Sequence, residues 1–342
     1  MKRSLTMLGA ALVLLLAGCA APPAAKPAAE SSATPSPLQF RACLISADTT
    51  TVSMQASQAL AQAKTELGVE TSEILSDDFA IQLQKFVDDG CQIIFGVGES
   101  VAEAIQAGAK ENPQVKFVLV DTNASESLPN LKVMVFNTHE VGFLAGYLAA
   151  SQTQSGKVGV FGGLFVPAVT MYLDGFVQGV NYYNEQKSAK VEVLGWDLAT
   201  KKGESISTAK PFNDPAAGET LAKKMVLDGA DVLMPVAGES GTGALASDAK
   251  IIWTDSDGCK TTSGCDKIIG SATKDIAAGV YEIIEKAITG DFTNALYIGT
   301  VKNGGAKLVG VKAEQGVVSE LDAAERGIIS GNITVTSDSA IG

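Results

Sequence analysis

Short runs of β-branched and aliphatic residues recur along the chain from Phe40 onward, and amphipathic segments with a helical period separate them. This alternation is typical of parallel sheets covered by helices, so the pattern predicts an α/β fold with two such sheets. The predicted strands form a first series at 40–47, 69–75, 91–97 and 115–120, a second at 157–161, 190–195, 230–236 and 250–254, and a last strand at 267–272. A helix over 275–287 follows the last strand.

A further helix is predicted to begin near Thr138, because Asn137 and Glu140 have the spacing of a capping box. Small residues then recur along one face, which predicts a close approach of this helix to the neighbouring sheet. These small residues are Gly142, Ala145, Gly146 and Ala149. His139 lies in the first turn, and we expect it to face solvent.

The N-terminal residues 1–18 have the pattern of a signal peptide. Lys2 and Arg3 precede an apolar run over 8–16 that is too short for an ordinary membrane span. The run ends in Leu-Ala-Gly-Cys, which resembles a bacterial lipobox with Cys19 as the lipidated residue. A simple secretory signal that happens to contain a cysteine is the alternative. Residues 19–37 are rich in Ala, Pro and Ser and predict a disordered tether, so we expect a lipid-anchored protein on the outer face of the cell membrane.

Composition limits the partners of the remaining chain. About 300 residues suffice for two lobes of about 150 each, and 46% hydrophobic and 6% aromatic residues fit a globular α/β protein. The formal net charge is −12, and it becomes −14 once Lys2 and Arg3 leave with the signal peptide. Such an acidic chain excludes nucleic-acid polymers, which require a basic surface, but it does not exclude an uncharged nucleoside.

Four cysteines remain after Cys19, and an exported protein meets an oxidising environment in which they can pair. Cys259 and Cys265 enclose a short loop, which predicts a disulfide. A zinc site is disfavoured because the only histidine is far away in the sequence. Cys43 and Cys91 lie in neighbouring predicted strands and are either buried thiols or a second bridge.

Acidic residues follow several predicted strands. In open α/β sheets, ligands bind beyond the carboxyl ends of the strands, where the loops converge. A single aspartate after a strand is usually a helix cap or a turn residue, but equivalent positions in both halves favour a binding site. The acids at such positions are Asp48, Asp121, Asp255 and Asp257.

Several motifs occur in the order shown by one family, and together they cover the chain after the tether. They are Gly96–Gly98, 112–121, Glu140–Ala150, Lys157–Gly163, 175–180, 212–218, 229–232, Ala237–Gly243, Asp255–Asp257 and Lys274. In this respect the sequence resembles the basic membrane protein family of lipoprotein receptors.

The resemblance implies a type I periplasmic-binding fold, in which three crossovers join two α/β lobes. It divides the chain into a first lobe of 38–154 plus 266–290 and a second lobe of 155–265 plus 291–342. Characterised members bind purine nucleosides for an ABC importer, so a small nucleoside-like ligand and an importer permease are the expected partners, and a monomer is the expected state. A ligand-sensing lipoprotein and a receptor for another ligand class are the alternatives.

Individual site residues also come from the resemblance. It implies that Asp255 accepts from the vicinal ribose hydroxyls and that Lys274 donates to the same sugar, where charge-assisted bonds are strong. Phe212 is similar to an aromatic residue that covers the base, and Gly238 to a loop glycine facing the cleft. A surface lysine and an ordinary core phenylalanine are the alternatives for two of these positions. The expected ligand-binding residues are Asp48, Gly98, Asp121, Phe212, Gly238, Asp255, Asp257 and Lys274.

The sequence departs from the family after the first strand. Family members carry a Ser-Phe-Asn motif there, whose Phe stacks on the base. Here the region is shortened to residues 48–55, with Val52 and Ser53 or Met54 and Gln55 in those places. The loss of one stacking residue leaves the identity of the base open.

An enzyme is the rival class. Its usual Ser-His-Asp or Cys-His arrangements need a histidine in a cleft loop, and no predicted cleft loop contains one. We therefore expect a binding protein that uses no cofactor and no metal.

Overall fold

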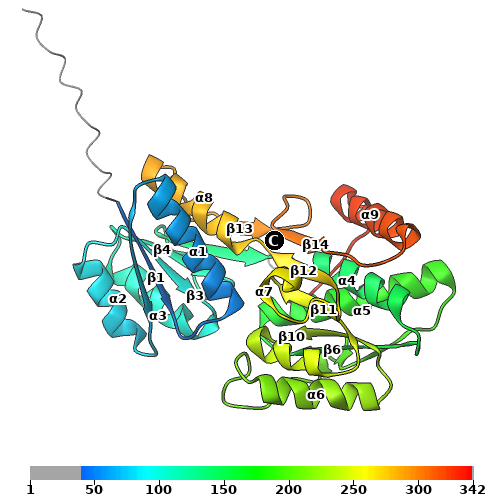
Figure 1. Cartoon of the computed structure of the whole chain (residues 1–342). Coiled ribbons are helices and arrows are strands. Elements are labelled where there is room, and N and C mark those ends of the chain that lie inside the picture. Colours follow the sequence, from blue (N-terminus) through cyan, green and yellow to red (C-terminus); the bar gives the residue numbers. More distant parts are fainter. Residues whose placement is uncertain (1–39, 341–342) are drawn as a thin grey trace, which may run out of the picture. The chain divides into compact units, whose positions relative to one another are not determined.

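The strands of the protein form two six-stranded sheets and a short two-stranded ribbon in the computed structural model, which describes residues 40–340 (Figure 1). The predicted signal peptide, lipidated Cys19 and tether lie outside the described residues. Within residues 40–340, no helix is both long enough and apolar enough to cross a membrane.

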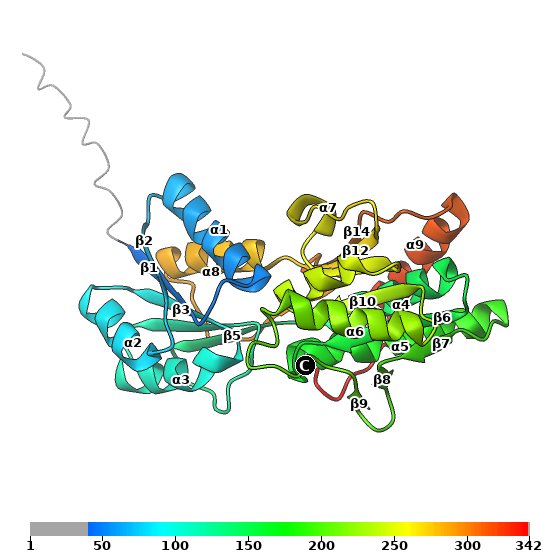
Figure 2. The same ribbon diagram turned by 60° about the horizontal axis from the view of Figure 1, so that its bottom comes forward.

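The first sheet has the order β13-β5-β4-β3-β1-β2, and all its pairs are parallel. Its strands are β1 Arg41–Ser46, β2 Glu70–Leu75, β3 Ile93–Val97, β4 Lys116–Val120, β5 Leu131–Phe136 and β13 Tyr297–Gly299. Two helices pack on each face, and this sheet with its helices is the first lobe (Figure 2). One face carries α1 Thr51–Glu66 and α8 Ile276–Thr289, and the other carries α2 Phe79–Asp88 and α3 Ala102–Glu111, which follows the 3₁₀ turn η1 Glu99–Val101.

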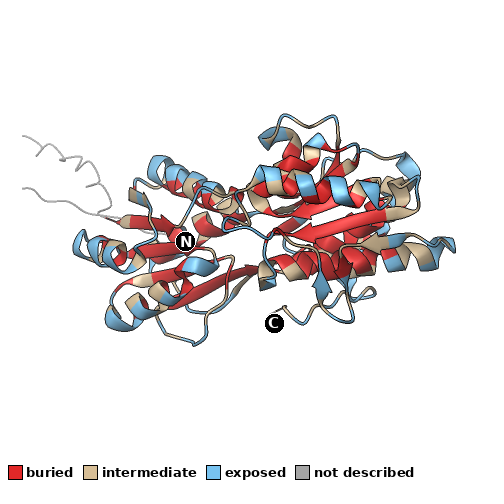
Figure 3. Ribbon diagram, turned by 90° about the horizontal axis from the view of Figure 1, so that it is seen from below, coloured by how far each residue is buried: buried red, intermediate tan, exposed pale blue. Residues whose placement is uncertain are grey.

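The second sheet has the order β14-β12-β11-β10-β6-β7, with β14 antiparallel and the other pairs parallel. Its strands are β6 Lys157–Gly162, β7 Glu192–Leu194, β10 Val232–Val236, β11 Lys250–Asp255, β12 Ile268–Lys274 and β14 Ala306–Val309. Helices cover both faces, and the central strands β6, β10, β11 and β12 are largely buried, as is helix α4 (Figure 3). The helical elements of this second lobe are α4 Thr138–Gln152, α5 Pro167–Lys187, α6 Pro215–Leu227, η2 Gly238–Ala246, α7 Gly258–Thr261 and α9 Gln315–Ser330. The ribbon pairs β8 Trp196–Asp197 with β9 Lys202–Gly203.

The chain passes between the two sheets three times, after β5, after β12 and after β13. Backbone hydrogen bonds join the three crossing segments. Asn137 N–H donates to Gly299 O at 2.7 Å, and Asp275 N–H donates to Gly305 O at 2.9 Å. The crossovers therefore form one connected hinge beside the ends of the strands.

The structure confirms each of the nine predicted strands to within a few residues, but it divides the lobes differently. The strand predicted at 267–272 was assigned to the first lobe, whereas β12 is a central strand of the second sheet. Conversely, β13 belongs to the first sheet although 291–342 was assigned to the second lobe. Only α8 within 266–290 packs on the first lobe. The predicted boundaries are thus wrong. The chain leaves the second sheet only after β12, adds α8 and the short strand β13 to the first lobe, and then returns to the second sheet at β14.

Helix α4 also belongs to the second lobe, which corrects the assignment of residues 38–154 to the first. Its glycines press on α5 and not on a sheet: a Cβ at Gly146 would lie 2.0 Å from Phe176 O. Asn137 is the N-cap residue, but its side chain makes no capping bond. The expectation that His139 faces solvent is wrong, because this side chain is 5% exposed beneath the α4–α5 contact.

Two disulfides stabilise the fold, one in each lobe. Cys259 and Cys265 are joined, as their spacing predicts, with a Cα–Cα distance of 4.4 Å. Cys43 and Cys91, for which the sequence left two possibilities, are also joined, with a Cα–Cα distance of 6.1 Å.

Candidate functional site

A cavity of about 680 Å³ lies where the carboxyl ends of the strands of both sheets converge. This volume is in the range of small-molecule sites. Seven of the eight residues expected to bind ligand line it: Asp48, Gly98, Asp121, Phe212, Gly238, Asp255 and Lys274. The structure therefore brings together residues that are up to 226 positions apart in the sequence.

Lys274 is the buried centre of this cleft. Its Nζ lies 2.6 Å from Asp121 Oδ2 of the first lobe and 3.0 Å from Asp255 Oδ1 of the second. The lysine side chain is 3% exposed, and its Nζ also lies 5.8 Å from the centre of the Tyr172 ring. Two carboxylates face one ammonium, so the triad carries a net negative charge and links the two lobes.

The two aspartates are held by the same unusual backbone conformation. Asp121 directly follows β4 and has a φ of 61°, and Asp255 ends β11 with a φ of 67°. Non-glycine residues rarely adopt left-handed backbone, and they do so most often at functional sites, where the surroundings stabilise the strain. Here each lobe turns one carboxylate toward the common lysine.

The charges of the triad depend on one another. Burial raises the pKa of Asp121, Lys274 opposes this change, and the neighbouring Asp255 adds to it. Burial disfavours the charge of Lys274, but the two carboxylates outweigh it and raise the pKa of the lysine above its usual value. The two carboxylates therefore favour the charged form of Lys274 in this cleft.

Asp255 retains capacity to accept hydrogen bonds. Its Oδ1 is buried and lies beside Lys274 Nζ, yet it receives no well-directed hydrogen bond from the protein. Its backbone oxygen accepts from Gln55 Nε2 at 2.9 Å, which joins α1 of the first lobe to β11 of the second. A buried acceptor without a directed donor costs free energy, so a ligand that supplies the donor gains affinity.

The second-lobe wall of the cleft carries the aromatic ring. Phe212 is half-buried and lies over Gly163, where a Cβ would be 2.5 Å from the ring. Gly238 starts η2 with a φ of 54°, and its added Cβ would lie 3.1 Å from Phe212 O. The two glycines thus fix the position of the ring at the edge of the cavity.

The first-lobe wall is aliphatic where the family has its Phe-Asn pair. Val52 lines the cleft, Ser53 is buried and bonds to Thr50 as a capping box for α1, and Met54 faces away from the cleft. Gln55 is the amide that reaches across to the second lobe. Residues 48–55 therefore place no aromatic side chain in the cleft, and the first-lobe aromatic residue that lines it, Phe136, comes from β5.

Sequence reasoning missed several polar residues of the first-lobe wall. Glu99, Thr122 and Asn123 line the cleft, and the Thr122 hydroxyl donates to the Glu99 carboxylate. Thr122 and Asn123 directly follow Asp121, so the rule that directed attention to strand ends would have found them had it been extended by two residues.

Another part of the cleft lining contains two aspartates and one lysine. Asp48 and Asp77 belong to the first lobe and Lys210 to the second, and all three line the cavity. Burial raises the pKa of Asp48, the neighbouring Asp77 adds to this effect, and Lys210 opposes it. Among residues 40–340, no group of three or more His, Cys, Asp or Glu side chains is arranged to hold a metal ion.

Asp257 is the one expected ligand residue that does not line the cleft. Its carboxylate accepts from Cys259 N–H at 3.2 Å, which caps α7, and it lies 2.9 Å from Lys260 Nζ. The simpler interpretation of an aspartate after a strand, a helix cap, therefore describes this residue.

Residues 50–338 match the family model described as ABC transporter substrate-binding protein PnrA-like. The ABC transporter nucleoside-binding protein BmpA of Lactococcus lactis is 29% identical over 282 residues, which cover 77% of this chain and 76% of the relative. Basic membrane protein A of Borreliella burgdorferi is 28% identical over 263 residues, covering 75% and 69%. A solute-binding protein from Aeropyrum pernix has a TM-score of 0.71 at 22% identity, covering 87% of this chain and 94% of that one. The fold is the type I periplasmic-binding fold, and the chain belongs to the PnrA-like family of ABC transporter substrate-binding proteins.

Proposed function

We propose that this substrate-binding protein captures a neutral, ribose-bearing ligand, a purine nucleoside, in the cleft between its lobes and delivers it to an ABC importer. The Lys274 triad carries the proposal. The two vicinal hydroxyls of ribose supply two donors for the carboxylate of Asp255, while Lys274 supplies donors for the ribose oxygens. Each hydroxyl removed from water then finds a partner.

The charge of the cleft supports a nucleoside over a nucleotide. Five acidic side chains line it against two lysines, and one of those lysines is already paired with two of the acids. A phosphate group would therefore enter a negative environment. The acids are Asp48, Asp77, Glu99, Asp121 and Asp255.

Phe212 supports a ligand with a flat aromatic part. Its ring stands at the cavity wall, and stacking of a base on an aromatic side chain contributes roughly 1–3 kcal/mol. The nucleoside-binding name of the Lactococcus lactis relative agrees with this chemistry.

Titration calorimetry tests the proposal. The full chain, purified in detergent, is titrated with adenosine, guanosine, inosine, uridine, free ribose and AMP. We expect the purine nucleosides to bind most tightly and AMP to bind at least about tenfold more weakly than adenosine, since the phosphate adds charge to an acidic cleft. If no nucleoside binds, the ligand belongs to another class, and native mass spectrometry of the freshly purified chain is the measurement that names it.

The membrane anchor and the importer are tested separately. Replacing Cys19 with Ser should release the protein from the membrane or stall its processing, and unchanged membrane fractionation with palmitate labelling would refute the anchor. Nucleoside uptake by cells that lack the gene should fall if the protein serves an importer. Normal uptake in those cells would instead favour a ligand-sensing lipoprotein of the same fold.

A further inference from the structure

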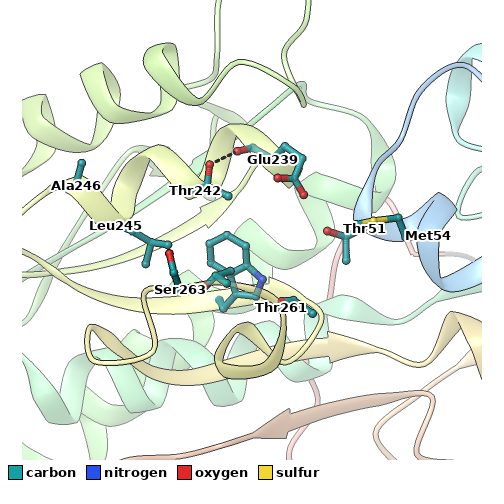
Figure 4. Close-up of a pocket in the computed structure, with 10 residues that line it drawn as sticks. Thr51, Met54, Glu239, Thr242, Leu245, Ala246, Thr261 and Ser263 are labelled. Atoms are coloured by element: carbon teal, nitrogen blue, oxygen red, sulfur yellow. Dashed lines mark hydrogen bonds between the residues drawn. The ribbon is translucent and has the colours of Figure 1, made fainter.

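A second cavity, of about 500 Å³, lies beside the cleft and has walls from both lobes (Figure 4). Figure 4 shows Glu239 and Thr242 on one side, Thr261 and Ser263 on another, and Thr51 from α1 closing a third. The proposed nucleoside site uses none of these residues except Thr51, which lines both cavities. The complete lining is Thr51, Met54, Glu239, Thr242, Leu245, Ala246, Trp253, Thr261, Thr262 and Ser263.

Three of the five hydroxyl groups that line this second cavity donate a hydrogen bond to the backbone. The Thr242 hydroxyl donates to Glu239 O at 2.7 Å, that of Thr261 to Asp257 O at 3.1 Å, and that of Thr262 to Gly258 O at 2.9 Å. A hydroxyl that donates internally offers only its oxygen lone pairs to a ligand. These three side chains therefore present acceptors to the cavity and no donors.

Glu239 adds a negative charge to this set of acceptors. Its carboxylate is directed into the cavity, and within residues 40–340 no side chain forms a hydrogen bond or an ion pair with it (Figure 4). No Lys, Arg or His lines the cavity to compensate the charge. The indole N–H of Trp253 is also used, because it donates to the Ser256 hydroxyl at 3.3 Å. A carboxylate together with three hydroxyls that already donate to the backbone is complementary to a ligand that carries several N–H donors and a positive charge.

The rest of the lining is apolar. Met54, Leu245, Ala246 and Trp253 provide hydrocarbon, thioether and indole surface. We propose that this second cavity is a binding site for a small organic cation, a protonated amine with a short aliphatic chain, whose ammonium group is held by Glu239 and whose chain lies against these four residues. An anion is disfavoured, since the cavity offers it neither a positive charge nor donors from the three bonded threonines.

The position of this cation site connects it to the cleft. Gln55, one residue after Met54, donates to the backbone oxygen of Asp255, two residues after Trp253. Because its walls come from both lobes, a bound cation stabilises this arrangement of the lobes. By linkage it should then raise the affinity of the cleft for its own ligand. This coupling rests on the proposed function, whereas binding of the cation itself does not.

The test uses n-butylammonium chloride as the probe, with butan-1-ol and sodium butyrate as the uncharged and anionic analogues. Each is titrated at pH 7 into the full chain in detergent and followed by ligand-observed NMR. We expect saturable binding of the cation, weaker binding of the alcohol and none of butyrate. Glu239→Gln should weaken butylammonium binding by about tenfold or more, the size expected when a charge-assisted hydrogen bond is lost.

Two further variants separate the site from general effects of charge. Glu111→Gln makes the same change at an exposed position of α3 in the first lobe and should leave binding unaltered. Ser263→Trp places a large side chain into the cavity from an exposed loop and should abolish binding of the probe while the fold is retained. The proposal is overturned if the unaltered chain shows no saturable binding of the cation, or if Glu239→Gln binds it as tightly. If nucleosides fail to bind, the proposed function is refuted, but the binding of butylammonium still tests the cation site on its own.

Discussion

The two lobes contribute equivalent aspartates to the ligand cleft, but the residues that form their walls differ. Asp121 and Asp255 end corresponding strands, share a left-handed backbone and contact the same lysine. The second lobe adds a ring, Phe212 over Gly163, whereas the first lobe offers Val52 and the polar pair of Glu99 and Thr122. The two aspartates and the shared lysine are therefore equivalent in the two lobes, whereas the walls differ and can select the remaining part of the proposed ligand.

The difference between the lobes extends to their disulfides, which gives the largest expected effect. The first-lobe bridge closes 48 residues and the second-lobe bridge closes 6. On the chain-entropy model, these loops correspond to about 4 and about 2 kcal/mol of stability. Replacing Cys43 and Cys91 by Ala should therefore destabilise the protein more than replacing Cys259 and Cys265. Urea unfolding of the full-length variants measures both, and equal losses would contradict the loop-length argument.

The aspartate–lysine cluster is tested at Asp255. Asp255→Ala removes the proposed acceptor of the two ribose hydroxyls and leaves Lys274 with a single carboxylate partner. We expect a loss of roughly 2–4 kcal/mol in nucleoside binding, or about 30-fold to 1000-fold in Kd. Calorimetry of the variant with the best nucleoside measures the change.

Asp257→Ala is the matched control for this experiment, because it removes a carboxylate two residues away that caps α7 outside the cleft. Nucleoside affinity should change by less than about threefold. A variant Asp255→Ala that binds like the unaltered chain, or an equal loss in both variants, would show that the cleft holds its ligand elsewhere.

Much of the fold follows from the sequence, because most predicted strands are apolar runs between turns, the pattern expected of strands that are buried on both faces. β5 was missed although its six residues are all buried, since the run over 131–136 follows a long loop and lacks a preceding helix. The lobe boundaries could not be derived, because they depend on which sheet a strand joins. Strand β12 has the same local pattern in either sheet.

The site shows the same limit at the level of single residues. Strand-end position predicted Asp48, Asp121 and Asp255 in the cleft, but it predicted Asp257 equally, and only the direction of the side chain separates these residues. The pairing of α4 with α5 buries His139, and no periodicity in the helix sequence predicts that a neighbouring helix will cover its first turn.

His139 of the second lobe makes the stability of the protein depend on pH. Burial lowers the pKa of His139 to about 4 from an ordinary 6.5, although Asp174 opposes the change. The unfolded chain therefore binds this proton between about pH 6.5 and pH 4 while the folded chain does not, so stability falls as the pH falls through this range. The loss from this one group approaches about 3 kcal/mol. The unfolding free energy of the His139→Gln variant should depend less on pH over this range than that of the unaltered chain. An equal dependence in both proteins would contradict a lowered pKa of His139.

The smallest expected effect concerns the walls of the cleft, where the two lobes differ most. Phe212→Ala removes the stacking ring and should weaken purine nucleosides by roughly 1–3 kcal/mol while changing free ribose little. Val52→Phe makes the opposite change, because it adds a ring to the first-lobe wall at the one of the two candidate positions, Val52 and Met54, that lines the cleft. An added ring on this wall should stack on the base and favour purines. The ratio of the Kd for uridine to the Kd for adenosine should therefore be larger in this variant than in the unaltered chain. Calorimetry of both variants with adenosine, guanosine, uridine and ribose measures how much each wall contributes to the binding affinity. An unchanged preference in Val52→Phe would mean that the base does not lie against α1, and that Glu99 and Thr122 form the relevant part of the first-lobe wall.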